Sequence, residues 1–288
     1  MSTDSNLQNE TINQLMLKCE GAYAPKTLKS YAADLRGFGA WCRDRHLCWF
    51  PSEGEIIARY IDEACAAFVM TTVRRKMAAI RFLHIMNDLP SPLDCAAVKL
   101  AYRRVMRRNR RQPNRAAPLT QDMLRKLLAT CDDTLVGRRD RAILLLGFES
   151  LARVAEIVAI RVGDVDGYRL LIPRSKSGSE GRGRFVRLSV ETRVAVGDWV
   201  TASDLREGVL FRRVRGGYIG ESAMDTGSIG RMLRARQGLL KLGSAKLLSG
   251  HSFRVGGAQH LMARGHSEIE IMLRGGWQKS ETMVGYLR

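Results

Sequence analysis

A short proline-containing segment, Gln112 to Pro118, divides this chain of 288 residues and limits the folds open to it. The segment reads QPNRAAP, and its two prolines around Asn and Ala favour an extended connection over a helix or a strand. Periodic apolar residues lie on both sides of it, so each side can bury a core of its own. We therefore predict a flexible tail (residues 1–21), a first domain (22–111), a linker (112–118) and a second domain (119–288).

The part of the chain before the linker shows helical periodicity. Pro25 suits the first turn of a helix, and after it apolar residues recur at three- and four-residue spacing: Leu28, Tyr31, Leu35, Phe38 and Cys42. Ser52 and Glu55 match a capping box before a second apolar run. A third helix is predicted from Thr71 or Thr72, and a fourth from about Leu93 to Arg110. This half is predicted to be an all-helical bundle with short loops.

The part after the linker is predicted to be mainly α with a small antiparallel sheet. Thr120 is a plausible cap for the helix QDMLRKLLATC, and two apolar helices follow in RRDRAILLLGFESLARVAEIVAIRV. Two short runs of β type, YRLLIP and GRFVRLS, flank the Gly/Ser-rich segment RSKSGSEGRG, which predicts a hairpin with a mobile turn. Helical patterns then return up to the C-terminus. The fold class is therefore mainly α: a helical bundle followed by a mixed, mostly helical α/β domain.

The charge of the chain indicates a polyanionic partner. Lys and Arg number 47 against 29 Asp and Glu, a formal net charge of +18. No apolar run approaches the roughly 20 residues of a membrane span, and the polar N-terminus lacks the pattern of a signal peptide. These features favour nucleic acid over a membrane as the partner, and they predict a cytoplasmic protein.

Positive charge is densest at the end of the fourth predicted helix, where no acidic residue occurs between Asp94 and Asp122. A charge run is often only a solvated face, but this density without balancing carboxylates favours contact with phosphates. Basic residues after the hairpin are candidates for the same role. The predicted DNA-binding residues are Arg103, Arg107, Arg108, Arg111, Arg215, Arg231 and Arg234.

The cysteines and histidines do not form a metal-binding pattern. The six cysteines all lie in the first half without C-x-x-C spacing, and they do not cluster with histidines. Free thiols in a reducing compartment are the simpler interpretation. No G-x-x-x-x-G-K-[ST] loop occurs, so nothing indicates the use of ATP. We predict neither a metal nor a cofactor.

The last forty residues contain the clearest candidate for chemistry. They include His251 and Arg254, which are three residues apart, so the two side chains share one face of a helix and can meet the same small anion. Tyr286 could reach that anion only if the chain folds back. In a basic protein the natural anion is a DNA phosphate, and the natural role of the tyrosine is that of nucleophile.

Together these segments resemble the tyrosine recombinase (phage integrase) family. An H-x-x-R pair alone is a weak signal, but the ordered set of His251, Arg254, Trp277 and Tyr286 is much more specific. Upstream, SLARVAEIVAIRVGDV is similar to the first arginine motif of the family and places that arginine at Arg153. Trp277 stands where most members carry a second histidine. This tryptophan makes the sequence most similar to Cre-type recombinases. The N-terminal segment FGAWCRDRHLCWFPSEGEIIARYI is also Cre-like, so the resemblance covers most of the chain.

The resemblance implies a role for each candidate residue. Tyr286 would attack a scissile phosphate, Arg153 and Arg254 would neutralise the pentavalent phosphorane, and His251 would accept or orient the phenolic proton. The family places its catalytic lysine in the β-hairpin, which points to Lys176 as the general acid, although a lysine in a Gly/Ser turn is more often simply exposed.

Two further residues have less decisive contexts. The indole N–H of Trp277 could bind a phosphate oxygen, and pure packing of its large ring is the alternative. Glu156 lies one helical turn after Arg153, where an acidic residue buttresses the active site in the family. Packing or an ion pair along the helix is an equally good interpretation of Glu156.

At the level of function, the resemblance implies a site-specific recombinase. It would act on double-stranded DNA with inverted-repeat sites, assemble as a tetramer, and pass through a 3′-phosphotyrosine link and a Holliday junction. Cre-like proteins continue beyond the tyrosine into a helix that docks on a neighbouring subunit, whereas this sequence stops two residues after Tyr286. If this is the natural end of the chain, assembly is expected to use another surface; if the chain is trimmed, a weaker tetramer is expected. The alternatives are a type IB topoisomerase or telomere resolvase with the same chemistry, or a non-catalytic DNA-binding protein with the same fold.

Overall fold

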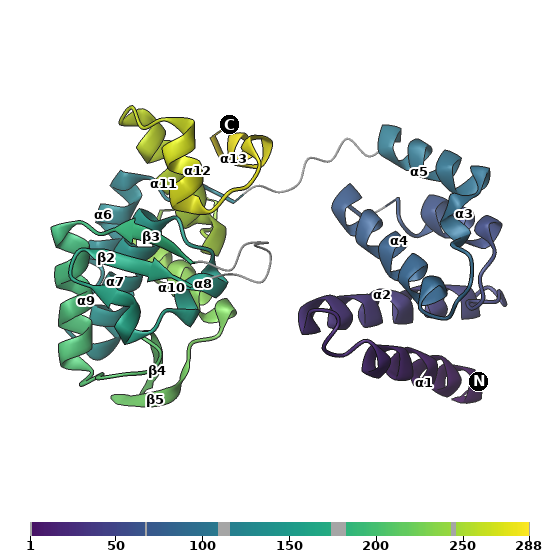
Figure 1. Cartoon of the computed structure of the whole chain (residues 1–288), viewed down its shortest axis with the longest axis horizontal. Helices are drawn as coiled ribbons and strands as arrows, with labels where there is room; N and C mark the ends of the chain where they lie inside the picture. The colour runs from purple at the N-terminus through teal and green to yellow at the C-terminus, as the bar shows by residue number, and fades with distance from the viewer. Residues whose placement is uncertain (1, 67, 109–115, 174–182, 243–245, 288) are drawn as a thin grey trace. The chain divides into compact units, whose positions relative to one another are not determined.

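A computed structural model describes residues 2–66, 68–108, 116–173, 183–242 and 246–287. The chain divides into two compact units, Met1–Asn114 and Arg115–Arg288 (Figure 1), and the division falls within the predicted linker. Both units are mostly helical, and the second adds small antiparallel sheets. The predicted fold class is therefore confirmed. In the described part of the chain, no helix is both long and apolar enough to cross a membrane.

The first unit is a helical bundle. Its helices are α1 (Ser2–Lys18), α2 (Pro25–Arg43), α3 (Gly54–Glu63), α4 (Met70–Ile85) and α5 (Ala96–Arg108), with a 3-10 turn, η1 (Pro92–Asp94), before α5. Helix α2 packs against α1 and α4, and α3 packs against α5. The third predicted helix is confirmed as α4, whose Val73, Met77, Ile80 and His84 are all buried.

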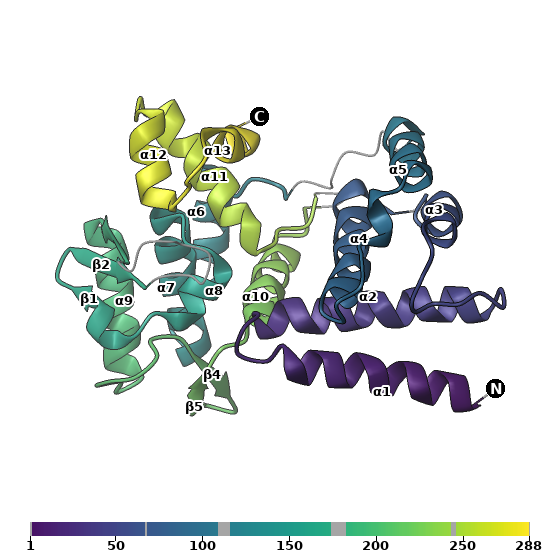
Figure 2. The same cartoon turned by 45° about the vertical axis from the view of Figure 1, so that its right-hand side comes forward.

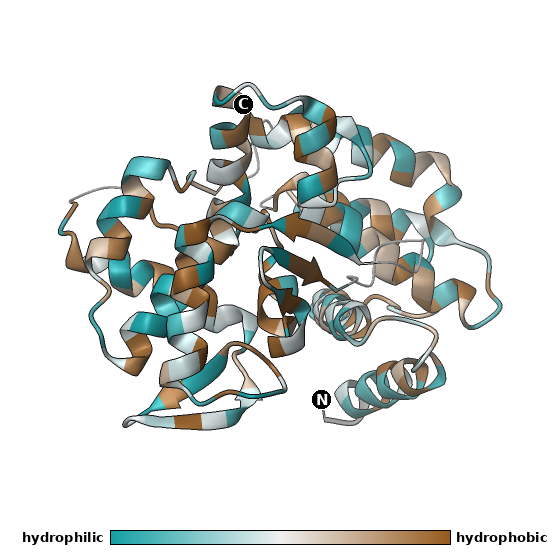
Figure 3. Ribbon diagram, turned by 60° about the vertical axis from the view of Figure 1, so that its left-hand side comes forward, coloured by the Kyte–Doolittle hydropathy of each residue, from teal (hydrophilic) through white to brown (hydrophobic). Residues whose placement is uncertain are grey.

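The prediction of a flexible N-terminal tail is wrong, since most of that segment forms helix α1. Figure 3 shows α1, next to the N label, as mostly hydrophilic, yet Ile12, Leu15 and Cys19 form a narrow apolar stripe that is buried in the core. The side chain of Gln8 is also buried, and a Cβ atom on Gly39 of α2 would lie 1.8 Å from its Nε2 atom. Three apolar positions are enough here because the two helices approach closely at a glycine.

The predicted capping box at Ser52 and Glu55 is also wrong. Helix α3 begins at Gly54 with Glu53 as its N-cap residue, and no side chain caps it. Instead, the backbone N–H of Ser52 donates to Nε2 of His84 at 3.0 Å, while Nδ1 of His84 lies 2.8 Å from the carbonyl oxygen of Ile80. Nδ1 therefore donates and Nε2 accepts, so the buried His84 is the neutral tautomer. Its burial lowers its pKa.

The second unit begins with helices α6 (Gln121–Ala129), α7 (Leu135–Ser150) and α8 (Val154–Ala159). The predicted cap is confirmed, because Oγ1 of Thr120 accepts from the N–H of Met123. After the 3-10 turn η2 (Val162–Asp164) come strands β1 (Val165–Asp166), β2 (Arg169–Ile172) and β3 (Arg184–Arg187), then α9 (Val190–Ala202), β4 (Arg212–Arg215), β5 (Tyr218–Ala223), α10 (Thr226–Leu239), α11 (Gly250–Ala263), α12 (Glu268–Gly275) and α13 (Ser280–Leu287).

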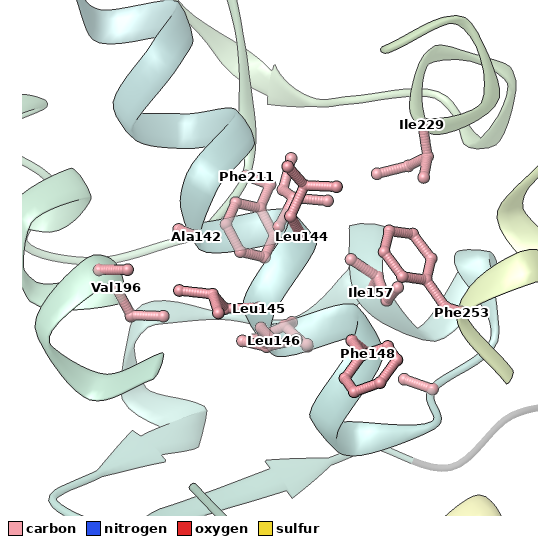
Figure 4. Close-up of a cluster of buried hydrophobic side chains, with 14 of the residues drawn as sticks. Ala142, Leu144, Leu145, Leu146, Phe148, Ile157, Val196, Phe211, Ile229 and Phe253 are labelled. Carbon is pink, nitrogen blue, oxygen red and sulfur yellow. The ribbon is translucent and has the colours of Figure 1, made fainter. Parts of the chain in front are cut away.

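Helix α7 lies at the centre of this unit's core. It packs against α9 on one side and α11 on another. Figure 4 shows side chains of α7, including Leu144 and Phe148, among Ile157, Phe211 and Phe253 from other elements. Residues 142–148 of α7 are all buried, because other elements surround this apolar part of the helix.

The two strands of the predicted hairpin are confirmed as the antiparallel pair β2 and β3 in a three-stranded sheet of order β1-β2-β3, and the predicted mobile turn between them lies outside the described residues. Leu170 pairs with Val186, and Ile172 pairs with Arg184. Leu170, Ile172 and Val186 are buried, as the alternation of a half-buried sheet requires. Helices α11, α12 and α13 lie together at one end of the unit (Figure 2). The ends of α7, β3 and α12 meet next to α11.

Candidate active site

The turn that follows α7 orients the first predicted arginine. Leu151 has a φ of 52°, the left-handed conformation that is unfavourable for a branched residue, and it is fully buried. The chain then reverses, and Arg153 becomes the N-cap residue of α8. The carbonyl oxygen of Leu151 accepts a hydrogen bond from Nη1 of Arg254. The strained turn therefore brings the two predicted arginines, which are far apart in the sequence, to one place.

Arg254 is held deep in the protein by the close packing of α11. A Cβ atom on Gly256 would lie 1.8 Å from the carbonyl oxygen of Leu119, and one on Gly257 would lie 2.5 Å from that of Phe148. The side chain of Arg254 is only 2% exposed, and its Nη1 also donates to the carbonyl oxygen of Gly275 at 2.8 Å. Burial, with the nearby charge of Arg153, lowers its pKa to about 10. The guanidinium thus remains a cation at neutral pH.

Glu156 is the acidic centre of the site, and it too is 2% exposed. Its Oε1 accepts from Nη1 of Arg153 at 2.7 Å, and its Oε2 accepts from the backbone N–H of Arg153 at 2.9 Å and from Nη2 of Arg184 at 2.8 Å. Burial alone would raise the pKa of this carboxyl, but the hydrogen bonds and charges of Arg184 and Arg153 outweigh it and lower the pKa. Glu156 is therefore ionised at neutral pH.

The aromatic residues of the C-terminal segment lie beside Arg254. Its guanidinium carbon lies 4.1 Å from the ring centroid of Trp277 and 5.7 Å from that of Tyr286. The two aromatic rings are 5.2 Å apart. Trp277 is buried in a small cluster with Leu151 and residues of α11 to α13, so it also packs. Stacking on two rings compensates part of the cost of burying the guanidinium.

His251 lies next to Tyr286. The two rings are almost parallel, with an interplanar angle of 15° and a centroid distance of 6.3 Å. The histidine is exposed at the edge of the site, and partial desolvation, followed by the charges of Arg254 and Arg153, lowers its pKa. It is therefore neutral at pH 7, which leaves a ring nitrogen able to accept a proton.

The structure thus brings together six of the seven residues that the sequence singled out for catalysis: Arg153, Glu156, His251, Arg254, Trp277 and Tyr286. Lys176 lies outside the described residues. The sequence analysis missed Arg184 as part of this site. Its role depends on tertiary contacts with α8 and α12, for which the sequence carries no local signal.

The predicted DNA-binding arginines differ in their surroundings. On α5, Arg103, Arg107 and Arg108 are exposed and make no ion pair with any residue that the structure describes, whereas Arg104 pairs with Asp62. Arg215 and Arg234 are likewise exposed and unpaired within the described ranges. Arg231 instead donates to Asp225 and Ser228. Arg111 lies outside the described residues.

Among the residues that the structure describes, no three His, Cys, Asp or Glu side chains come together as a metal site. The arginines, the carboxylate and the tyrosine instead form a cationic cluster, and guanidinium groups are suited to binding a phosphate.

Comparison with known proteins identifies the family of the chain. The profile of the phage integrase family matches residues 118–288, and that of the phage integrase N-terminal SAM-like domain matches residues 12–86. The chain therefore belongs to the phage integrase family, as the sequence predicted.

Individual relatives cover nearly the whole chain. Recombinase cre of Escherichia phage P1 is 30% identical over 95% of this chain and 87% of its own length. An integrase/recombinase xerD homolog of Selenomonas ruminantium is 26% identical over 97% of this chain and 87% of its own.

Solved structures share the fold. XerH site-specific recombinase bound to its difH substrate has a TM-score of 0.67 at 15% identity, covering 96% of this chain and 81% of that one. The Tn1549 transposon integrase in complex with transposon right-end DNA has a TM-score of 0.68 at 13% identity, covering 96% and 94%.

Proposed function

We propose that this protein is a tyrosine site-specific recombinase that cleaves and rejoins duplex DNA through a 3′-phosphotyrosine intermediate. The observation that supports this most strongly is the meeting of Arg153, Arg254, His251 and Tyr286 from three separate segments of the chain. Membership of the phage integrase family supports the same activity.

In the proposed cleavage step, the phenolic oxygen of Tyr286 attacks the scissile phosphorus and the bond from phosphorus to the 5′-oxygen breaks. The phenolic proton passes to His251, whose lowered pKa keeps it neutral and able to receive it. Lys176 supplies the proton that the departing 5′-oxygen needs. The number of protons balances, and a phosphotyrosine link and a free 5′-hydroxyl result.

The two arginines stabilise the charge that develops on the phosphorane. Arg254 is fixed by two carbonyl oxygens and two aromatic rings, so it needs no reorganisation when the charge appears. Arg153 is more exposed, at 37% of its side chain, so a phosphate oxygen can approach it from the solvent. Glu156 holds that guanidinium in place, and Trp277 packs against Arg254 and Tyr286.

Rejoining would reverse this chemistry with a new partner. The 5′-hydroxyl of a second duplex attacks the phosphotyrosine, and two such rounds pass through a Holliday junction. The bond energy is retained in the phosphotyrosine link, so the reaction requires no nucleotide cofactor. Such exchange pairs two sites with inverted repeats, each half bound by one protomer, and so calls for a tetramer on the DNA.

DNA binding is proposed for the exposed arginines. Arg103, Arg107 and Arg108 on α5 lack carboxylate partners among the described residues, so they are free to contact phosphates and release counterions. Arg215 and Arg234 are proposed to contact phosphates in the same way in the second unit. Arg231 is already paired with Asp225, so DNA would have to compete with that carboxylate.

The test is covalent capture. The protein is incubated with DNA fragments from its source replicon in EDTA, and adducts that resist SDS are isolated and sequenced. We expect an adduct that disappears completely with Tyr286→Phe and persists with Tyr218→Phe, a matched change at a highly exposed tyrosine of β5. Relaxation of supercoiled plasmids without a specific site would favour a topoisomerase. Binding without any adduct would favour a non-catalytic DNA-binding protein.

A further inference from the structure

Three consecutive carbonyl groups at the end of α12 each accept a hydrogen bond from a different arginine. Nε of Arg184 donates to the carbonyl oxygen of Arg274 at 2.8 Å, Nη1 of Arg254 donates to that of Gly275 at 2.8 Å, and Nη2 of Arg153 donates to that of Gly276 at 3.3 Å. The last carbonyls of a helix lack partners within the helix and carry partial negative charge. The end of α12 is thus a common acceptor for three guanidinium groups.

Arg184 and Arg153 are also joined through Glu156. Each binds one carboxylate oxygen, Arg184 at 2.8 Å and Arg153 at 2.7 Å, and each binds α12 as well. The contacts form a closed ring from β3 to α8, on to the end of α12 and back to β3. Because every member has two partners, removal of one arginine loosens the other.

Arg184 differs from Arg153 in the exposure of its side chain. Its side chain is 18% exposed against 37% for Arg153, although each of the two guanidinium groups donates to two partners. A Cβ atom on Gly276, which has a φ of 64°, would lie 3.0 Å from Nη1 of Arg184. The backbone before Trp277 therefore lies directly against Arg184. This environment suits a side chain that holds other groups in place, rather than one that binds a ligand.

We propose that Arg184 is a positioning residue of the recombination reaction: through Glu156 and the last turn of α12, it holds the guanidinium of Arg153 and the backbone that leads into Trp277. The inference rests on the proposed function for its chemistry. Arg184 acts through the fixed positions of its two donor groups, so a side chain that supplies only positive charge does not replace it. A lysine retains the positive charge but cannot donate to Glu156 and to Arg274 from two fixed edges of one plane.

The experiment measures single-turnover formation of the protein–DNA adduct on the DNA that the wild-type protein captures. Three variants are compared: Arg184→Met, Arg184→Lys, and Arg187→Met as a matched loss of charge from an exposed position of the same strand. We expect Arg184→Met to slow the cleavage step about a hundredfold, as a misplaced catalytic group does. DNA affinity should fall no further than with Arg187→Met, since each variant loses one charge.

The lysine variant separates geometry from charge. We expect Arg184→Lys to remain about tenfold slow or worse, and Arg187→Met to cleave at nearly the wild-type rate. The proposal is overturned if Arg184→Met cleaves as fast as Arg187→Met, or if Arg184→Lys restores the full rate. Thermal unfolding of all three variants identifies any that fails to fold. In that case Arg184→Gln, which retains a donor and an acceptor, replaces Arg184→Met.

A second measurement needs no cleavage and so distinguishes failure of this inference from failure of the proposed function. Inorganic phosphate is titrated into the DNA-free protein, and the Nε–Hε signals of the arginines are followed by NMR. If the wild-type protein forms no adduct with any DNA, the recombinase proposal fails, yet Arg184→Met should still bind phosphate more weakly than Arg187→Met. Equal phosphate binding by the two variants would reject the role of Arg184.

Discussion

A buried carboxylate lies between two cationic side chains in each unit, Asp34 in the first and Glu156 in the second, and these two arrangements serve different ends. In the first unit, Asp34 of α2 is 4% exposed and accepts from Nε and Nη2 of Arg75, with Nζ of Lys76 at 3.4 Å. Both cations belong to α4, so the cluster only ties two helices together. In the second unit, the cations around Glu156 come from α8 and β3 and continue to α12. The carboxylate of the second unit thus connects three elements around the candidate site, whereas that of the first unit connects two helices.

The largest expected effect comes from removing the negative charge in each cluster. We expect Glu156→Gln to slow adduct formation about tenfold to a hundredfold, because the two arginines lose the charge that orients them. We expect Asp34→Asn to lower the free energy of unfolding by about 2 kcal/mol and leave the cleavage step unchanged. The measurements are single-turnover cleavage and urea unfolding of both variants. Slow cleavage by a fully folded Asp34→Asn protein would break the distinction between the clusters.

Two glycines extend the comparison of the units to helix packing: Gly39 in the first unit and Gly256 in the second. A Cβ atom would meet an obstacle at 1.8 Å at both Gly256 and Gly39, but the obstacle is the backbone oxygen of Leu119 in the first case and the side-chain amide of Gln8 in the second. Backbone cannot move aside as a side chain can. We therefore expect Gly256→Ala to lower stability by about 1–3 kcal/mol and to reduce cleavage, since it displaces the helix that carries Arg254. Gly39→Ala should have the smaller effect in thermal unfolding and none on cleavage. Equal losses of stability would show that side-chain mobility does not matter here.

The smallest expected effect is the pH dependence of the first unit. Burial lowers the pKa of His84 in the folded protein, so the unfolded chain binds this proton more readily. Stability from His84 is therefore present above the unfolded-state pKa of about 6.5 and decreases as the pH falls below it. We expect His84→Gln to flatten the dependence of the unfolding midpoint between pH 7.5 and 5.5. His46→Gln, at an exposed histidine of the same unit, should leave the profile unchanged. If both variants keep the wild-type profile, the buried tautomer contributes nothing.

Sequence patterns carried the fold well where the signal was local. Helical periodicity located α2 and α4, and the two β-type runs located β2 and β3, because burial on one face leaves a visible period. Helix α1 was missed because Ile12, Leu15 and Cys19 are few, and their burial depends on a close approach at Gly39. For helix α1, the decisive information therefore lies in its partner helix, α2.

The candidate site, like the fold, could be predicted from the sequence only in part. Arg254 and His251 could be proposed from their spacing, and Tyr286 and Arg153 from the ordered resemblance. Nothing in the sequence indicated that Leu151 adopts a left-handed conformation or that Arg184 reaches Glu156. Both depend on the packing of segments that meet only in the folded unit.

The carbonyl groups at the end of α12 have a consequence for how such a site can change over time. A main-chain oxygen is present whatever the side chain, so substitutions at these positions cannot delete the acceptors of Arg153, Arg184 and Arg254 directly. At the two glycines they act through bulk and backbone strain, because a Cβ atom on Gly275 would lie 2.0 Å from the ring of Trp277 and Gly276 has a φ of 64°. Sequence variation in relatives would therefore record the size limit at Gly275 and Gly276 but not the hydrogen bonds themselves. Replacing single amides by esters in a semisynthetic chain weakens those acceptors without altering any side chain.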